Sequence, residues 1–222
     1  LQNIFEGLVK IDRTGKLQPC LAESWQIADD NITYRFKLRQ GAKFHDDTPF
    51  TAEQVKFSFE RAVAADSTNA QRQLFTPIAE ITTPDPATVV IKLKQPTANF
   101  LFGLAWGDAV IVAPATAANN KTNPVGTGPF KFVRWNRGDR LELARNDSYW
   151  GEKPALAKAT FRFMSDPQAQ VAALRAGDVD AHTNLSAPEA VPQLKADAKL
   201  KVTIGGTEGE TVLGINNAKP PF

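Results

Sequence analysis

The sequence predicts an α/β fold that carries an inserted, mainly β subdomain. Between residues 19 and 149, apolar residues alternate with polar ones and turn residues recur, which is the pattern of antiparallel hairpins. After Tyr149-Trp150-Gly151 the pattern changes to strand, helix and strand, which is typical of a parallel βαβ unit. We therefore expect residues 1–18 and 150–222 to form an α/β domain, with residues 19–149 inserted into it.

The composition is that of a globular chain with a sizeable core. The 222 residues are 42% hydrophobic and include 14 Phe, which is enough to fill the core of such a domain. The net charge is only +2 and the basic residues are scattered singly, which argues against a nucleic-acid partner or a lipid-binding patch. The longest apolar stretches, such as residues 109–118, fall short of the roughly 18 residues of a membrane span. We therefore expect no membrane insertion.

The cysteine and histidine content excludes several kinds of site. Cys20 is the single cysteine, so the chain can form neither an intrachain disulfide nor a multi-cysteine metal site. A small buried residue is favoured over a reactive thiol at this position. The two histidines, His45 and His182, lie in different motifs, so we expect no metal site and no cofactor. The chain begins at Leu1 without a charged and then apolar leader, and we expect that any signal peptide has been removed or is not included.

A strand, a turn and a capped helix follow one another between residues 32 and 63. Residues 32–38 alternate apolar and polar side chains, as a half-buried strand does. Residues 44–49 supply Asp and Pro for a turn. Thr51 and Gln54 fit a capping box, and apolar residues recur after them at helical spacing. This pattern predicts a helix that begins at Thr51.

Weaker patterns predict the other elements of the chain. For residues 99–106 a helix is only slightly favoured over a strand. The expected elements are a short helix in residues 1–7 with an extended exit, hairpins in residues 78–94 and 130–145, a strand at residues 160–164, a capped helix at residues 166–177, a strand at residues 179–181, a second helix that begins near Ser186, and strands at residues 201–204 and 211–216.

Four stretches of the sequence are similar to the signature of one known family. They read LAESW from Leu21, TYRFKLRQGAKFHDDTPFTAEQV from Thr33, PVGTGPF from Pro124 and NDSYWG from Asn146. Together they resemble the family 5 extracellular solute-binding proteins of ABC importers, the dipeptide, oligopeptide and nickel group. The family pattern has Gly where this chain has Asp47. Because Asp tolerates the left-handed backbone region better than most residues, we expect the turn to persist.

The resemblance implies a lobe of the type II periplasmic-binding-protein kind. Members of the family have two lobes that close on a ligand about a hinge. This chain is expected to hold most of one lobe, the α/β domain being its ligand-binding part, and the second lobe is expected to lie outside it. The implied role is a periplasmic, monomeric component that captures a peptide or similar small solute and delivers it to a membrane permease. A nickel complex, an opine or a sugar stays open as the solute.

The resemblance and the local pattern together give four candidate ligand contacts. Glu6 lies in a Phe-Glu-Gly-Leu stretch that borders the ligand cleft in the family, although a solvated carboxylate at a helix end is an equally good interpretation. Thr183 and Asn184 follow the strand predicted at residues 179–181, and ligands bind beyond the carboxyl ends of strands in open α/β sheets. The same position carries ligand contacts in the family. Trp106 is flanked by glycines that indicate a close backbone approach, although a core position is the more common role for such a Trp.

The glycines of the Gly126-Thr127-Gly128 segment do not form a phosphate-binding loop. A Walker loop has Lys and then Ser or Thr directly after its second Gly, whereas Pro129 follows here. The two glycines are better explained by the geometry of the backbone.

Two other functions are weaker alternatives. A hydrolase would need two carboxylates at a controlled separation, but Asp29-Asp30 and Asp46-Asp47 are adjacent pairs in turns, where their side chains diverge. The chain also contains no Gly-x-Ser-x-Gly elbow. A regulator could use the same binding fold, but no helix-turn-helix pattern is present. We therefore expect a binding protein and not an enzyme.

Overall fold

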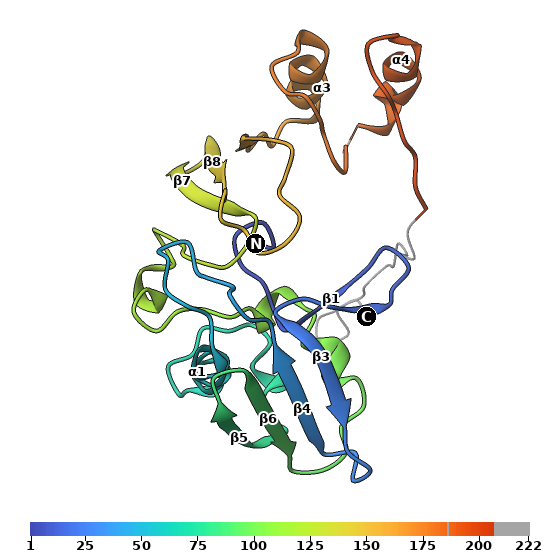
Figure 1. Ribbon diagram of the computed structural model, residues 1–222. Coiled ribbons are helices and arrows are strands. Elements are labelled where there is room, and N and C mark those ends of the chain that lie inside the picture. Colours follow the sequence, from blue (N-terminus) through green and yellow to red (C-terminus); the bar gives the residue numbers. More distant parts are fainter. Residues whose placement is uncertain (186, 207–222) are drawn as a thin grey trace, which may run out of the picture. The chain divides into compact units, whose positions relative to one another are not determined.

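A computed structural model describes residues 1–185 and 187–206 of the chain (Figure 1). The chain divides into two compact units, residues 1–163 and a second unit that begins at Met164. Two hydrophobic clusters lie in the first unit and one lies in the second.

The first unit is built around a four-stranded antiparallel sheet in the order β3-β4-β6-β5. The alternation predicted for residues 32–38 is confirmed, because Tyr34, Phe36 and Leu38 are buried while the residues between them are exposed. The hairpin predicted in residues 78–94 is also confirmed. The strands are β3 (Ala22–Ile27), β4 (Thr33–Leu38), β5 (Ile78–Asp85) and β6 (Thr88–Leu93).

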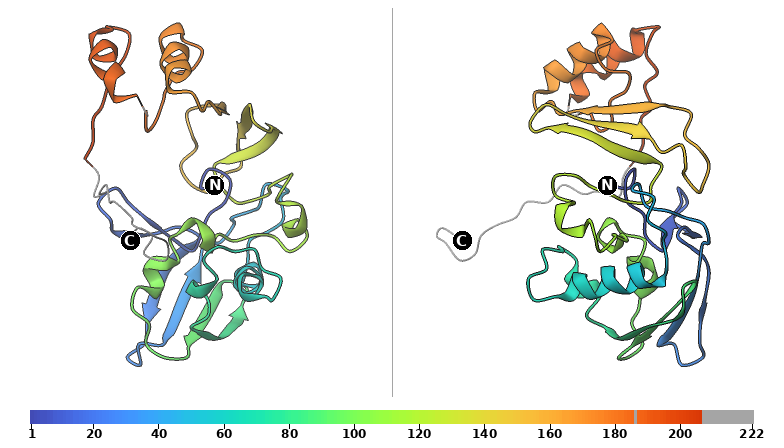
Figure 2. Two further views of the ribbon diagram at one scale, coloured as in Figure 1. Left: turned by 180° about the vertical axis from the view of Figure 1, so that it is seen from behind. Right: turned by 60° about the vertical axis from the view of Figure 1, so that its left-hand side comes forward.

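Helix α1 (Ala52–Val63) packs against β5 and β6 of this sheet (Figure 2). Its apolar residues Val55 and Phe59 are fully buried, as their helical spacing predicts. The capping box predicted at Thr51 is present, and Gln54 Oε1 accepts hydrogen bonds from the backbone N and the Oγ1 of Thr51 at 2.7 Å each. The start of this helix is therefore fixed by local sequence.

The turn before α1 has the left-handed backbone expected from the sequence. Asp47 has a φ of 65°, and its amide donates to the Phe44 carbonyl at 3.0 Å.

The first unit also contains four short helices. One of them, α2, lies in residues 99–106, for which the sequence slightly favoured a helix. The four are η1 (Arg72–Leu74), α2 (Phe100–Gly103), η2 (Gly107–Ala109) and η3 (Ala117–Asn119).

A second antiparallel sheet of the first unit is formed by β7 (Phe130–Asn136), β8 (Arg140–Arg145) and β9 (Lys158–Arg162). The hairpin predicted in residues 130–145 is confirmed as β7 and β8. Strand β9 pairs with β8 over five residue pairs, from Arg140 with Arg162 to Ala144 with Lys158. The predicted domain boundary between residues 149 and 150 therefore falls between two paired strands, and the split domain plan stays a prediction.

The short helix predicted in residues 1–7 is wrong. Ile4 and Phe5 both donate their amides to the Leu1 carbonyl in a turn, and the chain then enters β1 (Val9–Ile11), which pairs with β2 (Leu17–Pro19). The reason is a long-range pairing that local spacing does not reveal. The carbonyls of Asn3 and Ile4 accept hydrogen bonds from the amides of Phe130 and Gly128, both at 2.9 Å, and not from the amides of the next turn, so the helix does not continue.

Within residues 164–185 and 187–206, the second unit contains two packed α-helices. In α3 (Pro167–Ala176), Asp166 caps the first turn by accepting from the Ala169 amide at 2.6 Å, and Gly177 ends the helix with a φ of 79°, as predicted. The helix predicted near Ser186, a residue outside the described part, is found as η4 (Pro188–Ala190) and α4 (Val191–Ala196). Val171 of α3 and Leu194 of α4 lie in one buried cluster.

Two strands predicted for the second unit are wrong. Residues 179–181 and 201–204 form no strand, and all pairs between strands of the described residues are antiparallel, so the parallel βαβ unit is not present there. A parallel strand is stable only when a neighbouring strand satisfies its backbone groups, and residues 164–185 and 187–206 supply none. The strand predicted at residues 211–216 lies outside the described residues.

Replacing Thr51 by Ala should lower the free energy of unfolding by about 1 kcal/mol, the usual contribution of an N-cap side chain. The loss arises because the Thr51 hydroxyl bond to Gln54 disappears and the first turn of α1 loses its side-chain cap. Urea denaturation followed by Trp fluorescence measures this change. An unaltered denaturation midpoint would show that the cap contributes nothing.

Candidate functional site

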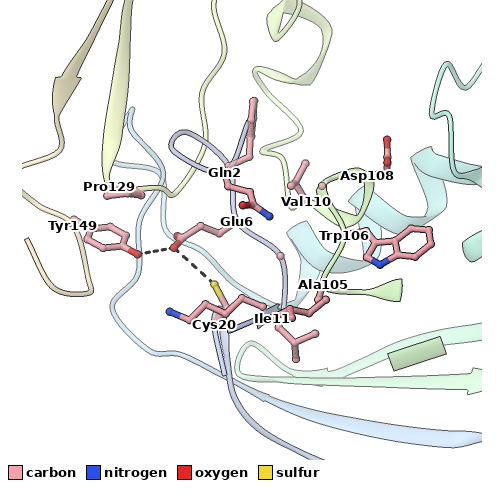
Figure 3. Close-up of a pocket in the computed structure, with 15 residues that line it drawn as sticks. Gln2, Glu6, Ile11, Cys20, Ala105, Trp106, Asp108, Val110, Pro129 and Tyr149 are labelled. Carbon is pink, nitrogen blue, oxygen red and sulfur yellow. Dashed lines mark hydrogen bonds between the residues drawn. The ribbon is translucent and has the colours of Figure 1, made fainter. Parts of the chain in front are cut away.

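A pocket of about 590 Å³ opens in the first unit between the N-terminal segment, β1 and the η2 turn (Figure 3). Two of the four predicted ligand contacts, Glu6 and Trp106, line it. The other lining residues are Gln2, Phe5, Gly7, Val9, Lys10, Ile11, Cys20, Ala105, Gly107, Asp108, Val110, Pro129 and Tyr149.

Glu6 is a buried carboxylate, only 8% exposed, that four side chains surround. Its Oε1 accepts from the Tyr149 hydroxyl at 2.6 Å and lies 3.8 Å from the Cys20 thiol. Its Oε2 accepts from Trp150 Nε1 and from Thr127 Oγ1, both at 2.9 Å. The interpretation of Glu6 as a solvated helix-end carboxylate is therefore wrong. Figure 3 shows Tyr149 and Cys20 directed at it from opposite sides.

The donors around Glu6 come from three distant parts of the chain and are uncharged. No Lys or Arg of the described residues forms an ion pair with this carboxylate. Arg39 contacts two of the surrounding residues and not Glu6 itself: its guanidinium stacks 4.2 Å from the centre of the Trp150 ring, and its Nε donates to the Cys20 carbonyl at 3.1 Å. Hydrogen bonds to a charged acceptor are about twice as strong as neutral ones, so this carboxylate ties the three segments together.

The Gly126-Thr127-Gly128 segment presses against the N-terminal segment. A Cβ atom on Gly126 would lie 2.0 Å from the Ile4 carbonyl oxygen, and one on Gly128 would lie 2.7 Å from that of Asn3. The prediction that these glycines serve backbone geometry is confirmed. The close approach brings the fully buried Thr127 to Glu6.

His45 holds the same segment from its other side. Its Nδ1 accepts from the Gly126 amide at 3.3 Å, which assigns the proton to Nε2, and Nε2 donates to the Gly128 carbonyl at 2.9 Å. The His45 carbonyl accepts from Lys131 Nζ at 3.0 Å. Burial lowers the pKa of the imidazole below its ordinary value, so the neutral ring is the one that the fold requires.

The groups next to Glu6 are kept protonated. Burial, with the Glu6 carboxylate nearby, raises the pKa of the Cys20 thiol to about 12. Burial and the hydrogen bond to Glu6 also raise the pKa of Tyr149 above its ordinary value. The thiolate is the reactive form of cysteine, so Cys20 is the buried structural residue that the sequence indicated.

Trp106 is 45% exposed, so the expectation that a Trp at this position belongs to the core is wrong. It precedes η2 and lines the pocket together with Asp108 of that turn. Lys10 of β1 also lines the pocket and is exposed. Neither Lys10 nor Asp108 was predicted from the sequence, because isolated charges in a turn and a short strand carry no motif.

Thr183 and Asn184 belong to the second unit. Both are exposed, and Asn184 has a left-handed backbone with a φ of 58°. The strand that was expected to place them is not formed, so their role as ligand contacts stays a prediction.

The described residues show neither a cluster of metal ligands nor a membrane-spanning helix. In residues 1–185 and 187–206, no three His, Cys, Asp or Glu side chains group as metal ligands. Both ring nitrogens of His45 are engaged by backbone groups. Within the same ranges, every helix is too short or too polar to pass through a lipid bilayer.

Replacing Glu6 by Gln should lower the free energy of unfolding by about 2 kcal/mol, because bonds to a charged acceptor contribute roughly 1.5 to 3 kcal/mol and neutral ones less. The amide also turns a donor toward groups that are themselves donors. The matched control is Glu60→Gln on the exposed face of α1, which should change the value by less than about 0.5 kcal/mol. Equal losses in the two variants, measured by urea denaturation, would contradict the role given to Glu6.

The hydrogen bonds of the His45 ring to Gly126 and Gly128 predict a loss of stability at mildly acidic pH. Because its pKa is lowered in the folded protein, the unfolded chain binds more protons below the ordinary value of about 6.5, and the free energy of unfolding falls as the pH falls. The contribution is fully present above about pH 7.5 and decreases as the pH falls toward about 5.5, above the range in which carboxylates titrate. A His45→Gln variant should show a flatter profile across this window. Parallel profiles for the two proteins would show that His45 does not cause the loss.

Comparison with known proteins identifies the family. The family model for bacterial extracellular solute-binding proteins, family 5, middle, matches residues 16–222. A Brucella ovis protein, named provisionally as an ABC transporter peptide-binding protein, is 34% identical over 230 residues, which cover 99% of this chain and 43% of the relative. The glutathione-binding protein GsiB of Pectobacterium atrosepticum is 35% identical over 182 residues, covering 80% of this chain and 35% of GsiB.

A solved structure agrees with these relatives. The periplasmic binding protein AgaA from A. tumefaciens R10, in complex with agropinic acid, matches with a TM-score of 0.81 and 38% identity over 88% of this chain and 40% of AgaA. The chain spans about two fifths of the length of these proteins. The predicted fold class, a lobe of the type II periplasmic-binding-protein kind, is confirmed. The chain therefore belongs to family 5 of the bacterial extracellular solute-binding proteins.

Proposed function

We propose that the protein is the solute-binding component of an ABC importer. In this role it acts as a monomer in the periplasm, captures a peptide or a similar small solute, and delivers it to a membrane permease. The names of the relatives support binding and transport, and they give no support to a hydrolase or a regulator. Thr183 and Asn184 are proposed as further ligand contacts from the second unit.

The observation that carries this proposal is the edge of β1. Three consecutive residues, Val9, Lys10 and Ile11, line the pocket. Side chains of a strand alternate between its two faces. Consecutive residues can therefore line the same pocket only when the edge of the strand, and not one face, is turned toward that pocket. Among the described residues β1 pairs only with β2, so its second edge has no strand partner. An extended, amide-containing solute can form hydrogen bonds along such an edge.

The Glu6 network prepares this edge for binding. Glu6 lies three residues before β1, and its backbone carbonyl accepts from the Ile111 amide at 2.8 Å. Its side chain is held by Thr127, Tyr149 and Trp150. A wall that is already ordered loses little conformational entropy when a solute binds, which favours affinity. We therefore assign Glu6 the role of positioning the binding strand.

The proposed solute class is peptides and similar small molecules. The relatives carry names that refer to peptides and to glutathione, and AgaA was solved with agropinic acid. The solutes named for these relatives thus differ in chemical class. A peptide is favoured because the open strand edge recognises backbone amides of any sequence.

The test is ligand binding by the complete protein, purified after denaturation and refolding to remove any copurified solute. Thermal-shift assays would use di-, tri- and pentapeptide mixtures, glutathione, agropinic acid and a nickel–histidine complex, followed by calorimetry of each hit. At least one solute should raise the midpoint and bind with micromolar affinity or better. Failure of every solute, together with the absence of a copurified small molecule in native mass spectrometry, would contradict the proposal.

A further inference from the structure

We propose that Asp108 and Trp106 select an amino-acid-derived solute that carries an ammonium or guanidinium group. Asp108 supplies the charge that recognises this group, and the Trp106 indole supplies a face for it. This inference rests on the proposed function, because it names the solute class of the same pocket.

The charges that line the pocket single out Asp108. Two carboxylates, Glu6 and Asp108, and one ammonium group, Lys10, line it. Both carboxylate oxygens of Glu6 already accept hydrogen bonds, from Tyr149, Trp150 and Thr127. Among the described residues, the Asp108 side chain has no hydrogen bond or ion pair, and no ion pair joins it to Lys10. Asp108 is thus the lining carboxylate that a solute can engage.

The η2 turn that carries both residues is firmly held. The Ala109 amide donates to the Trp106 carbonyl at 3.0 Å, and Asn69 Nδ2 donates to the Asp108 carbonyl at 2.9 Å. Two residues after η2, the Ile111 amide donates a backbone hydrogen bond to the Glu6 carbonyl, which holds this turn beside the N-terminal segment. Ala109 itself is buried. The backbone is therefore ordered by internal bonds, while the side chains of Trp106 and Asp108 make none of them.

Trp106 supplies the aromatic surface beside Asp108. Its side chain is 45% exposed and lines the pocket, so the indole offers a solute an apolar face. Trp is the best aromatic partner for a cation, and the interaction strengthens where water is excluded. Figure 3 shows the indole and the Asp108 carboxylate on the same side of the pocket, away from Glu6. Together they suit a cation.

The test compares solutes that differ only in charge. The complete protein would be titrated by calorimetry with tripeptides in which Lys or norleucine occupies each position of Ala-Ala-Ala, and with arginine and citrulline derivatives. The wild type should bind the cationic member of at least one pair about tenfold more tightly, the usual scale of such a charge and cation–π contact. An Asp108→Asn variant should lose this preference and keep its affinity for the neutral member.

Two further variants make the result specific. Asp66→Asn removes the same charge from an exposed position outside the pocket and should keep the preference. Trp106→Leu should reduce the preference without abolishing it. Circular dichroism and the thermal midpoint of each variant without solute should match the wild type, because the Asp108 and Trp106 side chains form no hydrogen bonds within the described residues.

The outcomes separate this inference from the proposed function. Equal binding of charged and neutral members by the wild type, or an unaltered preference in Asp108→Asn, overturns the inference and leaves the proposed function standing. If the protein binds none of these compounds but copurifies with an anionic or neutral solute, the inference is likewise overturned and the proposed function stands. Absence of any bound solute contradicts both.

Discussion

The buried Glu6 carboxylate is the interaction on which the first unit depends. A carboxylate taken out of water is costly unless its oxygens are satisfied, and here neutral donors from residues 20, 127, 149 and 150 surround it. The cost of removing one donor is high because the remaining charge would stay buried. The network therefore holds the N-terminal segment, and with it β1, in one position.

The sequence stretches that resemble the family have separate tasks around this carboxylate. Gly126 and Gly128 allow the close approach that brings Thr127 to Glu6, and His45 fixes their backbone from the other side. Tyr149 and Trp150 supply two of the donors. None of these residues needs to touch a solute to matter for binding. They hold Glu6, which lines the pocket, while Lys10, Trp106 and Asp108 are the exposed or partly exposed side chains that give the pocket its chemical character.

Local sequence predicted the elements whose causes are local. The cap at Thr51, the hairpins at residues 78–94 and 130–145, and the helix that begins after Asp166 were all found. The helix predicted at residues 1–7 was wrong because the partners of its carbonyls, Gly128 and Phe130, are more than a hundred residues away in sequence. The strand at residues 179–181 was wrong because alternation alone cannot supply a neighbouring strand. Glu6 was predicted as a site residue from the family resemblance. Its burial and its hydrogen-bond donors could not be predicted, because the donors lie far from it in sequence and no local pattern links them to it.

The Glu6 network also constrains the order in which the chain can fold. The hydrogen bonds from Tyr149 and Trp150 to Glu6 join residues that are 143 and 144 positions apart, so during synthesis Glu6 is made long before these two partners. The entropy of closing such loops is lost before the contacts compensate for it, and long-range contacts of this kind slow folding. The β3-β4-β6-β5 sheet and α1 need only residues 22–93, so they can form while the N-terminal segment is still unattached. The Glu6 network is then assembled late, so β1 is held in its final position only after the sheet and α1 have formed.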